Sequence, residues 1–384
     1  MSSKHSGLRG ILSAVTRRRA SGPNSANERT ARDVPPIDLA QALGPRNDAR
    51  ATRDWIERMA AHYLGPDVDP GLIDEIEERN LTIAQMEEAL LAHDDQKLSG
   101  PIISRYDRSA GQRMHFTSDR MLIYIPAAKI VFCPIGKVAN TAVKGWAIEL
   151  SGRQVESEGA IHRSIDQQDV PLQVQAWTRW RFDQVCQDPE WAFVALVRDP
   201  ALRLVSAYWD KFVIQRAFEN TLQHTRPVLE CVYGTENLRE EDVEKGITFR
   251  QFCQYLDAAS RQAVDSHWAP QYQYLENFRW DRLFNLDRVQ DFERFVRKRC
   301  APEYRGFPLG MRNAVPKHKR NKRNVEPLVD VLPNELLSMS AKRPSVHAFL
   351  TPDIERFISN YYALDYVLLN AAGRTRTWPL GSRF

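Results

Sequence analysis

Two short apolar runs in the chain each lead, through a polar elbow, into a segment with helical spacing. Residues 129–133 are β-branched and aromatic, and residues 192–197 are apolar throughout, so both runs are typical of buried strands. Pro134 and Gly136 interrupt the first run immediately before its helical segment. Strand–elbow–helix units of this kind predict an α/β fold with a parallel sheet.

The first elbow carries a lysine just before a predicted helix start. Apolar residues at positions 143, 146 and 150 give this helix a core-facing side, with Asn140 or Thr141 as its N-cap. The N–H groups of the first turn and the positive end of the helix dipole favour a bound anion. Lys137 in the elbow and Lys144 one turn into the helix add positive charge to such a site. The alternative interpretation is an ordinary strand–loop–helix with a solvated lysine.

An ATP-type P-loop fits this elbow less well. That motif requires Gly-x-x-x-x-Gly-Lys-Ser/Thr, whereas Val138 follows Gly136-Lys137 and no glycine stands five residues before Gly136. The hydroxyl that would bind Mg²⁺ is therefore missing from its usual place.

The second unit places an arginine at the carboxyl end of a strand, where ligands bind in open α/β sheets. Asp199 is a natural N-cap and Pro200 a natural first helical residue. Arg198 and Ser206 could converge on one phosphate, through a bidentate guanidinium and a hydroxyl. Arg198 could instead pair with Asp199 or with a carboxylate of the helix. Two phosphate sites in one chain predict a ligand with phosphates at two separate positions.

These segments resemble those of a known family. Lys137-Val-Ala-Asn-Thr141-Ala-Val-Lys144 resembles the 5′-phosphosulfate-binding loop of carbohydrate sulfotransferases, and Arg198-Asp-Pro-Ala-Leu-Arg203-Leu-Val-Ser206-Ala-Tyr208-Trp-Asp-Lys-Phe212 resembles their 3′-phosphate-binding segment. Weaker similarities follow in the same order at His-Trp-Ala-Pro-Gln (267–271) and at residues 361–369. The resemblance spans residues 129–370 and is greatest to the Golgi chondroitin/dermatan 4-O-sulfotransferase group. It implies a P-loop-like three-layer sulfotransferase fold with a central parallel sheet.

The resemblance also implies a donor, an acceptor class and site residues. The donor would be 3′-phosphoadenosine 5′-phosphosulfate (PAPS), and the acceptor a hydroxyl of a carbohydrate such as a polysaccharide, glycolipid or glycoside. Lys137 would contact the bridging and 5′-phosphate oxygens, while Arg198 and Ser206 would hold the 3′-phosphate. Sulfuryl transfer depends on positioning and electrostatics, and we expect no metal because the transferred group carries less charge than a phosphoryl group. The predicted donor-binding residues are Lys137, Val138, Ala139, Asn140, Thr141, Ala142, Lys144, Arg198 and Ser206.

The acceptor hydroxyl needs a general base, for which histidine is suited near neutral pH. His162 lies between the two segments, where related sulfotransferases carry their candidate base. His267 is the second candidate, although its segment could instead shape the acceptor cleft. Asp166 or Glu149 could substitute for a histidine. The predicted catalytic residues are Lys137, His162 and His267.

The chain departs from this family in three places. Gly136 stands where relatives usually carry Pro, and Val143 where many carry Trp. The cysteines that follow the His-Trp pair in the Golgi enzymes are absent. The five cysteines present, at positions 133, 186, 231, 253 and 300, have neither metal-site spacing nor a disulfide pattern. With no apolar stretch of membrane-spanning length, these features predict a cytoplasmic enzyme of bacterial type.

Composition divides the chain into four parts. We expect a basic disordered tail over 1–50, an N-terminal helical appendage over 51–99, the sulfotransferase domain over 100–372 and a C-terminal tail over 373–384. Residues 8–19 have the spacing of a short basic amphipathic helix, which could associate peripherally with the inner membrane.

Two further features leave alternatives open. The basic run 317–323 could close over a nucleotide, could contact an anionic sugar, or could be a solvated loop. The net charge of the whole chain is only +4, so this run does not predict a nucleic-acid partner. Aromatic residues at positions 268, 272, 274 and 280 could stack on sugar rings or belong to the core.

Two other functional classes are compatible with the sequence. One is a nucleotide-dependent kinase or NTPase, which would require Mg²⁺. The other is a catalytically silent nucleotide-binding module that lacks a base.

Overall fold

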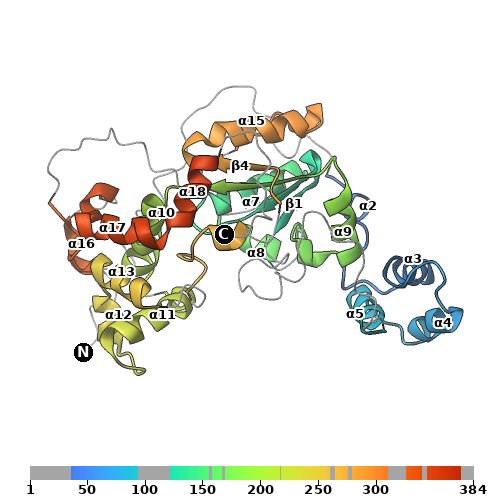
Figure 1. Cartoon of the computed structure of the whole chain (residues 1–384), viewed down its shortest axis with the longest axis horizontal. Helices are drawn as coiled ribbons and strands as arrows, with labels where there is room; N and C mark the ends of the chain where they lie inside the picture. The colour runs from blue at the N-terminus through green and yellow to red at the C-terminus, as the bar shows by residue number, and fades with distance from the viewer. Residues whose placement is uncertain are drawn as a thin grey trace.

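A computed structural model shows one four-stranded sheet near the middle of the chain's fold (Figure 1). Strands β2 and β3 are parallel, as are β3 and β4, whereas β1 pairs with β2 in the antiparallel sense at one edge. The predicted α/β class is confirmed, and the antiparallel edge strand is an addition to the expected parallel sheet. The strands, in both chain and sheet order, are β1 (Ile123–Ile125), β2 (Ile130–Cys133), β3 (Ala192–Val197) and β4 (Arg282–Asn285).

The structure describes residues 36–93, 122–154, 158–166, 169–216, 218–259, 264–275, 279–309, 326–339 and 344–372. The proposed membrane-surface helix at 8–19, the basic run at 317–323 and the C-terminal tail lie outside these residues. None of the described helices combines the length and apolar character needed to cross a bilayer.

Helices and short turns surround the sheet. Those of the main body are α2 (Leu39–Leu43), η3 (Pro126–Ala128), α7 (Asn140–Leu150), α8 (Glu158–Asp166), η4 (Val174–Ala176), α9 (Arg179–Gln187), α10 (Pro200–Tyr208), η5 (Trp209–Ile214), α11 (Glu219–Tyr233), α12 (Glu240–Lys245), α13 (Phe249–Ala258), α14 (Tyr272–Leu275), η6 (Leu286–Arg288), α15 (Val289–Arg299), η7 (Pro302–Tyr304), α16 (Pro333–Met339), η8 (Val346–Phe349), α17 (Pro352–Tyr361) and α18 (Ala363–Ala371).

Aromatic contacts show that helices cover both faces of the sheet. Phe132 of β2 and Phe284 of β4 pair in register with β3 residues two positions apart, so their side chains share one face. Phe292 of α15 meets both rings there, with centroid distances of 5.6 and 5.4 Å. On the opposite face, Phe193 of β3 lies 6.2 Å from Phe182 of α9. The sheet therefore lies between two helical layers.

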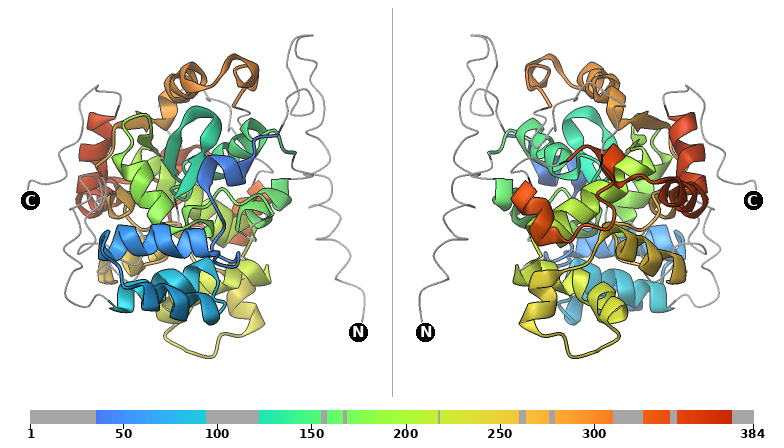
Figure 2. Two further views of the ribbon diagram at one scale, coloured as in Figure 1. Left: turned by 90° about the vertical axis from the view of Figure 1, so that its right-hand side faces the viewer. Right: turned by 90° about the vertical axis from the view of Figure 1, so that its left-hand side faces the viewer.

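The N-terminal helices form a unit with its own small core at one end of the molecule (Figures 1 and 2). Trp180 of α9 connects this unit to the main body: its ring lies 5.1 Å from that of Trp55, edge to face, and its backbone N–H donates to Glu87 at 3.1 Å. Asp69 caps the second of these helices, which begins at Pro70, and the third begins just after Thr82, in agreement with the helical appendage predicted for this part of the chain. The three helices are α3 (Arg53–Leu64), α4 (Pro70–Glu78) and α5 (Ile83–His93).

The segment of residues 264–275 is fixed to the C-terminal helices by a buried carboxylate. Asp365 of α18 accepts hydrogen bonds from the backbone N–H groups of Gln271 (2.8 Å) and Tyr272 (3.0 Å) and from the Gln271 side-chain amide (3.2 Å). Nearby, the Tyr362 hydroxyl donates to the carbonyl of Trp268 at 2.7 Å. The two downstream sequence similarities, at 267–271 and 361–369, are therefore parts of one cluster.

We expect Asp365→Ala to lower the free energy of unfolding by about 3 kcal/mol, because three buried donors would lose their acceptor. Urea denaturation followed by tryptophan fluorescence would measure this loss. Asp353→Ala is the matched control: Asp353 pairs with Arg250 at the surface, where its side chain is 57% exposed, so its loss should cost less than about 1 kcal/mol. Equal effects of the two substitutions would contradict the anchoring role of Asp365.

Candidate active site

The elbow between β2 and α7 is built on left-handed backbone. Lys137 and Ala139 have φ values of 65° and 55°, so the chain turns sharply before the helix begins at Asn140. Ala139 is the N-cap and makes no side-chain capping bond; the expectation that Asn140 or Thr141 would be the cap is therefore wrong. Since no side chain closes the first turn in this way, its N–H groups are available to an anion.

The second predicted segment meets this elbow. Arg198 follows β3, the parallel neighbour of β2, and its guanidinium donates to the carbonyl of Lys137 at 3.0 Å. Asp199 caps α10 as predicted, accepting from the N–H of Leu202 at 2.9 Å. Ser206 is partly exposed on the same helix. The two segments expected to bind phosphates thus lie side by side at the carboxyl ends of β2 and β3.

A buried arginine for which no role was predicted holds the elbow in place. Arg203 of α10 is 1% exposed. Its guanidinium donates to the carbonyls of Gly136 (2.9 Å), Ala269 (2.7 Å) and Ser266 (3.3 Å). The side chain therefore joins the elbow to the His267 segment. Its place in the Arg198–Phe212 motif was the only available signal.

The ammonium of Lys137 pairs with the carboxylate of Asp210. Asp210 lies in η5, a π-helical continuation of α10, and local π-helix is common at functional sites. Burial lowers the pKa of the adjacent Lys211, with Asp210 opposing this and Lys137 adding to it. Asp210 was not predicted, although it belongs to the same motif.

The structure separates the candidate bases. His162 of α8 lies against the start of α7, with its Nε2 3.0 Å from the Thr141 hydroxyl. Glu149 is near the other end of α7, about 13 Å along the helix from Asn140, so it does not reach the elbow. The side chain of Asp166 lies outside the described residues. Lys144 is buried within α7.

His267 lies beside the elbow and belongs to a cluster with Asp265 and His224 of α11. Asp265 contacts Nδ1 of both histidines at 2.7 Å, and the two rings lie 4.5 Å apart between centroids. Burial opposes ionisation of Asp265, but hydrogen bonds from His267 and His224 and the charge of His267 lower its pKa to about 2. Burial lowers the pKa of His267, against the effect of Asp265.

The aromatic side chains of this region belong mostly to the core. Trp268, Tyr274 and Trp280 are each 1% exposed. Trp268 packs against Phe212 and Phe252, and Trp280 packs against Phe193 of β3. Of the two alternatives left open by the sequence, the core position is the one that these three residues occupy. Tyr272 is partly buried.

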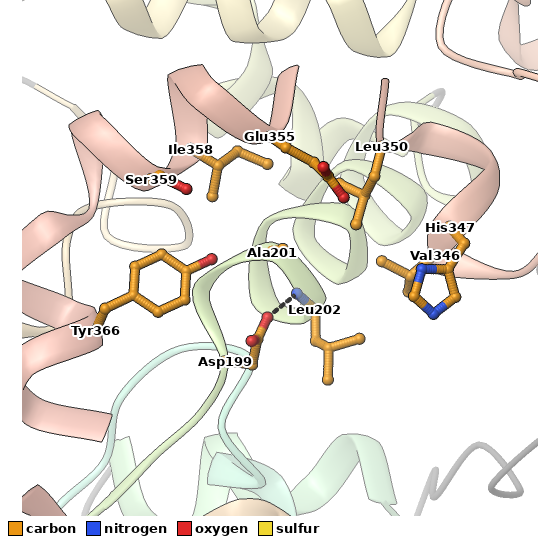
Figure 3. Close-up of a pocket in the computed structure, with 10 residues that line it drawn as sticks. All are labelled: Asp199, Ala201, Leu202, Val346, His347, Leu350, Glu355, Ile358, Ser359 and Tyr366. Atoms are coloured by element: carbon orange, nitrogen blue, oxygen red, sulfur yellow. Dashed lines mark hydrogen bonds between the residues drawn. The ribbon is translucent and has the colours of Figure 1, made fainter. Parts of the chain in front are cut away.

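A pocket of about 300 Å³ lies on another side of α10 (Figure 3). Leu202 points into it, whereas the next residue, Arg203, reaches the elbow. Two carboxylates in its wall make it unsuitable for an anionic donor. The lining residues are Asp199, Ala201, Leu202, Val346, His347, Leu350, Glu355, Ile358, Ser359 and Tyr366.

Comparison with known proteins identifies the class. Residues 120–370 match the model of the sulfotransferase family, and the chain belongs to that family, as the sequence resemblance predicted. Similar proteins include carbohydrate sulfotransferase 10 of Danio rerio, 31% identical over 156 residues (39% of this chain and 41% of that protein), and that of Homo sapiens, 29% identical over 163 residues with the same coverage. The chain spans about two fifths of the length of these curated relatives. No solved structure matches it.

The elbow leaves little room for a side chain at Gly136. A Cβ there would lie 3.3 Å from the Ser266 carbonyl oxygen and 3.5 Å from the His267 Cα, both backbone atoms held by the Arg203 network. We expect Gly136→Ala to lower the free energy of unfolding by about 1–3 kcal/mol, measured by urea denaturation.

Gly159→Ala is the matched control, because Gly159 is helical and its Cβ would meet nothing within 4 Å. Alanine is the better helix former, so this change should leave stability unchanged or raise it by up to about 1 kcal/mol. If both substitutions had the same sign and size, the close approach at Gly136 would not be a constraint.

Proposed function

We propose that the chain transfers a sulfuryl group from PAPS to a carbohydrate hydroxyl. The observation that carries this proposal is the meeting of the two predicted phosphate segments, where Arg198 donates to the carbonyl of Lys137. A donor with a 5′-phosphosulfate and a 3′-phosphate requires two such neighbouring subsites. The acceptor class is supported by the relatives, which are named carbohydrate sulfotransferases.

The donor set at the elbow fits the 5′-phosphosulfate end. It combines the Lys137 ammonium, the first-turn N–H groups of α7 and the Thr141 hydroxyl. In the free protein Lys137 pairs with Asp210, and the two side chains are 18% and 30% exposed. The pair is partly buried, so donor binding would exchange one charge-assisted bond of the Lys137 ammonium for another, to a phosphate oxygen. Asp210 keeps the ammonium near the elbow until then.

Arg198 and Ser206 fit the 3′-phosphate end. Arg198 offers a planar set of N–H donors at the carboxyl edge of β3, and Ser206 offers a hydroxyl from α10. With this assignment, the two phosphates of the donor would lie on opposite sides of the contact between Arg198 and Lys137. Lys137 then lies where it stabilises charge on the departing 5′-phosphate.

Calorimetric titration with 3′-phosphoadenosine 5′-phosphate would test the two subsites. We expect binding that is unchanged by EDTA and at least about tenfold weaker for 5′-AMP, which lacks the 3′-phosphate and its charge-assisted bonds. ATP with Mg²⁺ is the comparison ligand. Preference for Mg-ATP would instead favour a kinase or NTPase.

Lys137→Ala and Arg198→Ala should each lower sulfuryl transfer at least ~10²-fold, because each removes a charge that binds the donor or stabilises the leaving group. Transfer of labelled sulfate to desulfated chondroitin would measure the rates. Lys129→Ala is the matched control: Lys129 lies at the amino end of β2, pairs with Glu190 and is 51% exposed. Rates near wild type in both site variants would refute the site assignment.

A further inference from the structure

We propose that His267 is the general base of this site, with Nε2 as its accepting atom, and that Asp265 is the positioning residue that fixes its tautomer. The inference rests on the proposed sulfotransferase function. It identifies a pair of residues that act on the acceptor, in addition to the residues assigned to the donor.

The hydrogen bonds determine where the protons lie. Asp265 is ionised over the whole physiological range, because its pKa is about 2, so its oxygens only accept. Nδ1 of His267 and Nδ1 of His224, each 2.7 Å away, must therefore both donate. Neutral His267 consequently carries its proton on Nδ1 and leaves the Nε2 lone pair free to act as a base.

The position of His267 suits a base that acts beside the donor. Its backbone lies against Gly136, next to the lysine of the elbow. A Cβ added at Gly136 would lie only 3.5 Å from the His267 Cα. Its side chain is 24% exposed, so an acceptor hydroxyl can approach it. Its backbone N–H also donates to Asp265 at 2.8 Å, which holds the carboxylate in place beside the ring.

His162 is placed differently. Its Nε2, the atom that a base of this kind would use, lies 3.0 Å from the Thr141 hydroxyl in the first turn of α7. That turn belongs to the proposed 5′-phosphosulfate subsite. His162 therefore orients a donor-binding hydroxyl, and His267 is the histidine assigned to the acceptor.

The proton balance of the step is complete with these groups. The acceptor oxygen forms the new O–S bond, the bond between sulfur and the 5′-phosphate oxygen breaks, and the leaving phosphate keeps that electron pair. The acceptor proton moves to Nε2 of His267. The imidazolium that forms is stabilised by the Asp265 carboxylate and later loses its proton to water.

A metal ion is the competing explanation, since the ligand atoms of His224, Asp265 and His267 lie within 4.8 Å of one another. Two observations favour a metal-free pair of His267 and Asp265, called the dyad below. Both carboxylate oxygens already accept ring N–H groups at 2.7 Å. The positive charge of Lys211 also acts on this cluster, which disfavours a cation.

The charged groups around His267 determine the pH dependence. Asp265 raises its pKa, while burial, Lys211 of η5 and His224 of α11 lower it, with a net lowering from 6.5; the Lys137–Asp210 pair lies next to Lys211. A base must be neutral, so transfer should rise with pH through the His267 pKa, in the range below 6.5. Asp265→Asn removes the one group that raises the pKa and should move this acid limb to lower pH.

The test compares four variants with PAPS as donor and desulfated chondroitin as acceptor. His267→Asn keeps a donor toward Asp265 but removes the base, and should lower kcat about 10²-fold or more. Asp265→Asn should also lower kcat, and both should leave the affinity for 3′-phosphoadenosine 5′-phosphate within about twofold, since neither residue contacts the donor. His162→Gln changes the partner of the donor-binding Thr141 hydroxyl, so its effect should fall on the affinity for the donor and leave the acid limb of the kcat profile in place. His347→Gln, in the separate pocket, is the matched control.

Several results would overturn the proposal. These are retention of kcat by His267→Asn, loss of kcat in His162→Gln alone, loss of donor affinity in Asp265→Asn, or activity removed by a chelator and restored by zinc. By contrast, a wild-type protein that neither binds the bisphosphate nor transfers sulfate would refute the proposed function itself.

Nitrogen-15 NMR of the histidine rings gives a readout that does not depend on the acceptor. We expect wild-type His267 at pH 8 to be protonated on Nδ1 and bare on Nε2, and Asp265→Asn to lower its pKa and disturb this tautomer. The opposite tautomer in the wild-type protein would exclude the dyad even if chondroitin is not an acceptor.

Discussion

One backbone segment, residues 266–272, is held between two buried charges of opposite sign, and the geometry of the site depends on this arrangement. The Arg203 guanidinium donates to the carbonyls of Ser266 and Ala269. The Asp365 carboxylate accepts from the backbone N–H groups of Gln271 and Tyr272. Burial raises the pKa of Asp365, whereas the charge of Arg203 lowers it. Each charge is thus solvated by peptide groups instead of water, which makes its burial tolerable.

The same network connects the proposed donor and acceptor sides. Arg203 also binds the carbonyl of Gly136, so the phosphate elbow and the His267 segment share one rigid support. Gln271 extends this support, since its side chain accepts from the N–H of Arg198 at 2.9 Å and donates to the Arg198 carbonyl at 2.8 Å. Transfer between two substrates requires fixed relative positions, and here four segments of the chain supply them through direct hydrogen bonds.

Strands and helix starts that depend on local signals could be predicted from the sequence. Side-chain pairs between segments far apart in the chain could not. The strand at 192–197 and the start of α10 at Asp199-Pro200 were predicted correctly, because apolar runs and capping residues act locally. The predicted N-cap of α7 was wrong because Ala139, with left-handed backbone, occupies this position in place of a polar residue. Asp210 was missed because its partner Lys137 lies 73 residues away, and no local pattern records such a pair. Asp265 lies only two residues from His267, but its other partner, His224, is 41 residues away, so the sequence does not show that the three side chains form one cluster.

The π-helical winding of residues 209–214 makes the length of this stretch as important as its composition. A π-turn is in effect a one-residue insertion into an α-helix. Deleting Trp209 would turn Asp210 by about 100° around the axis of α10, away from Lys137. Substitutions that keep the residue count would preserve the orientation. Between Ser206 and Phe212, homologous chains with working sites are therefore expected to differ in side chains far more readily than in number of residues.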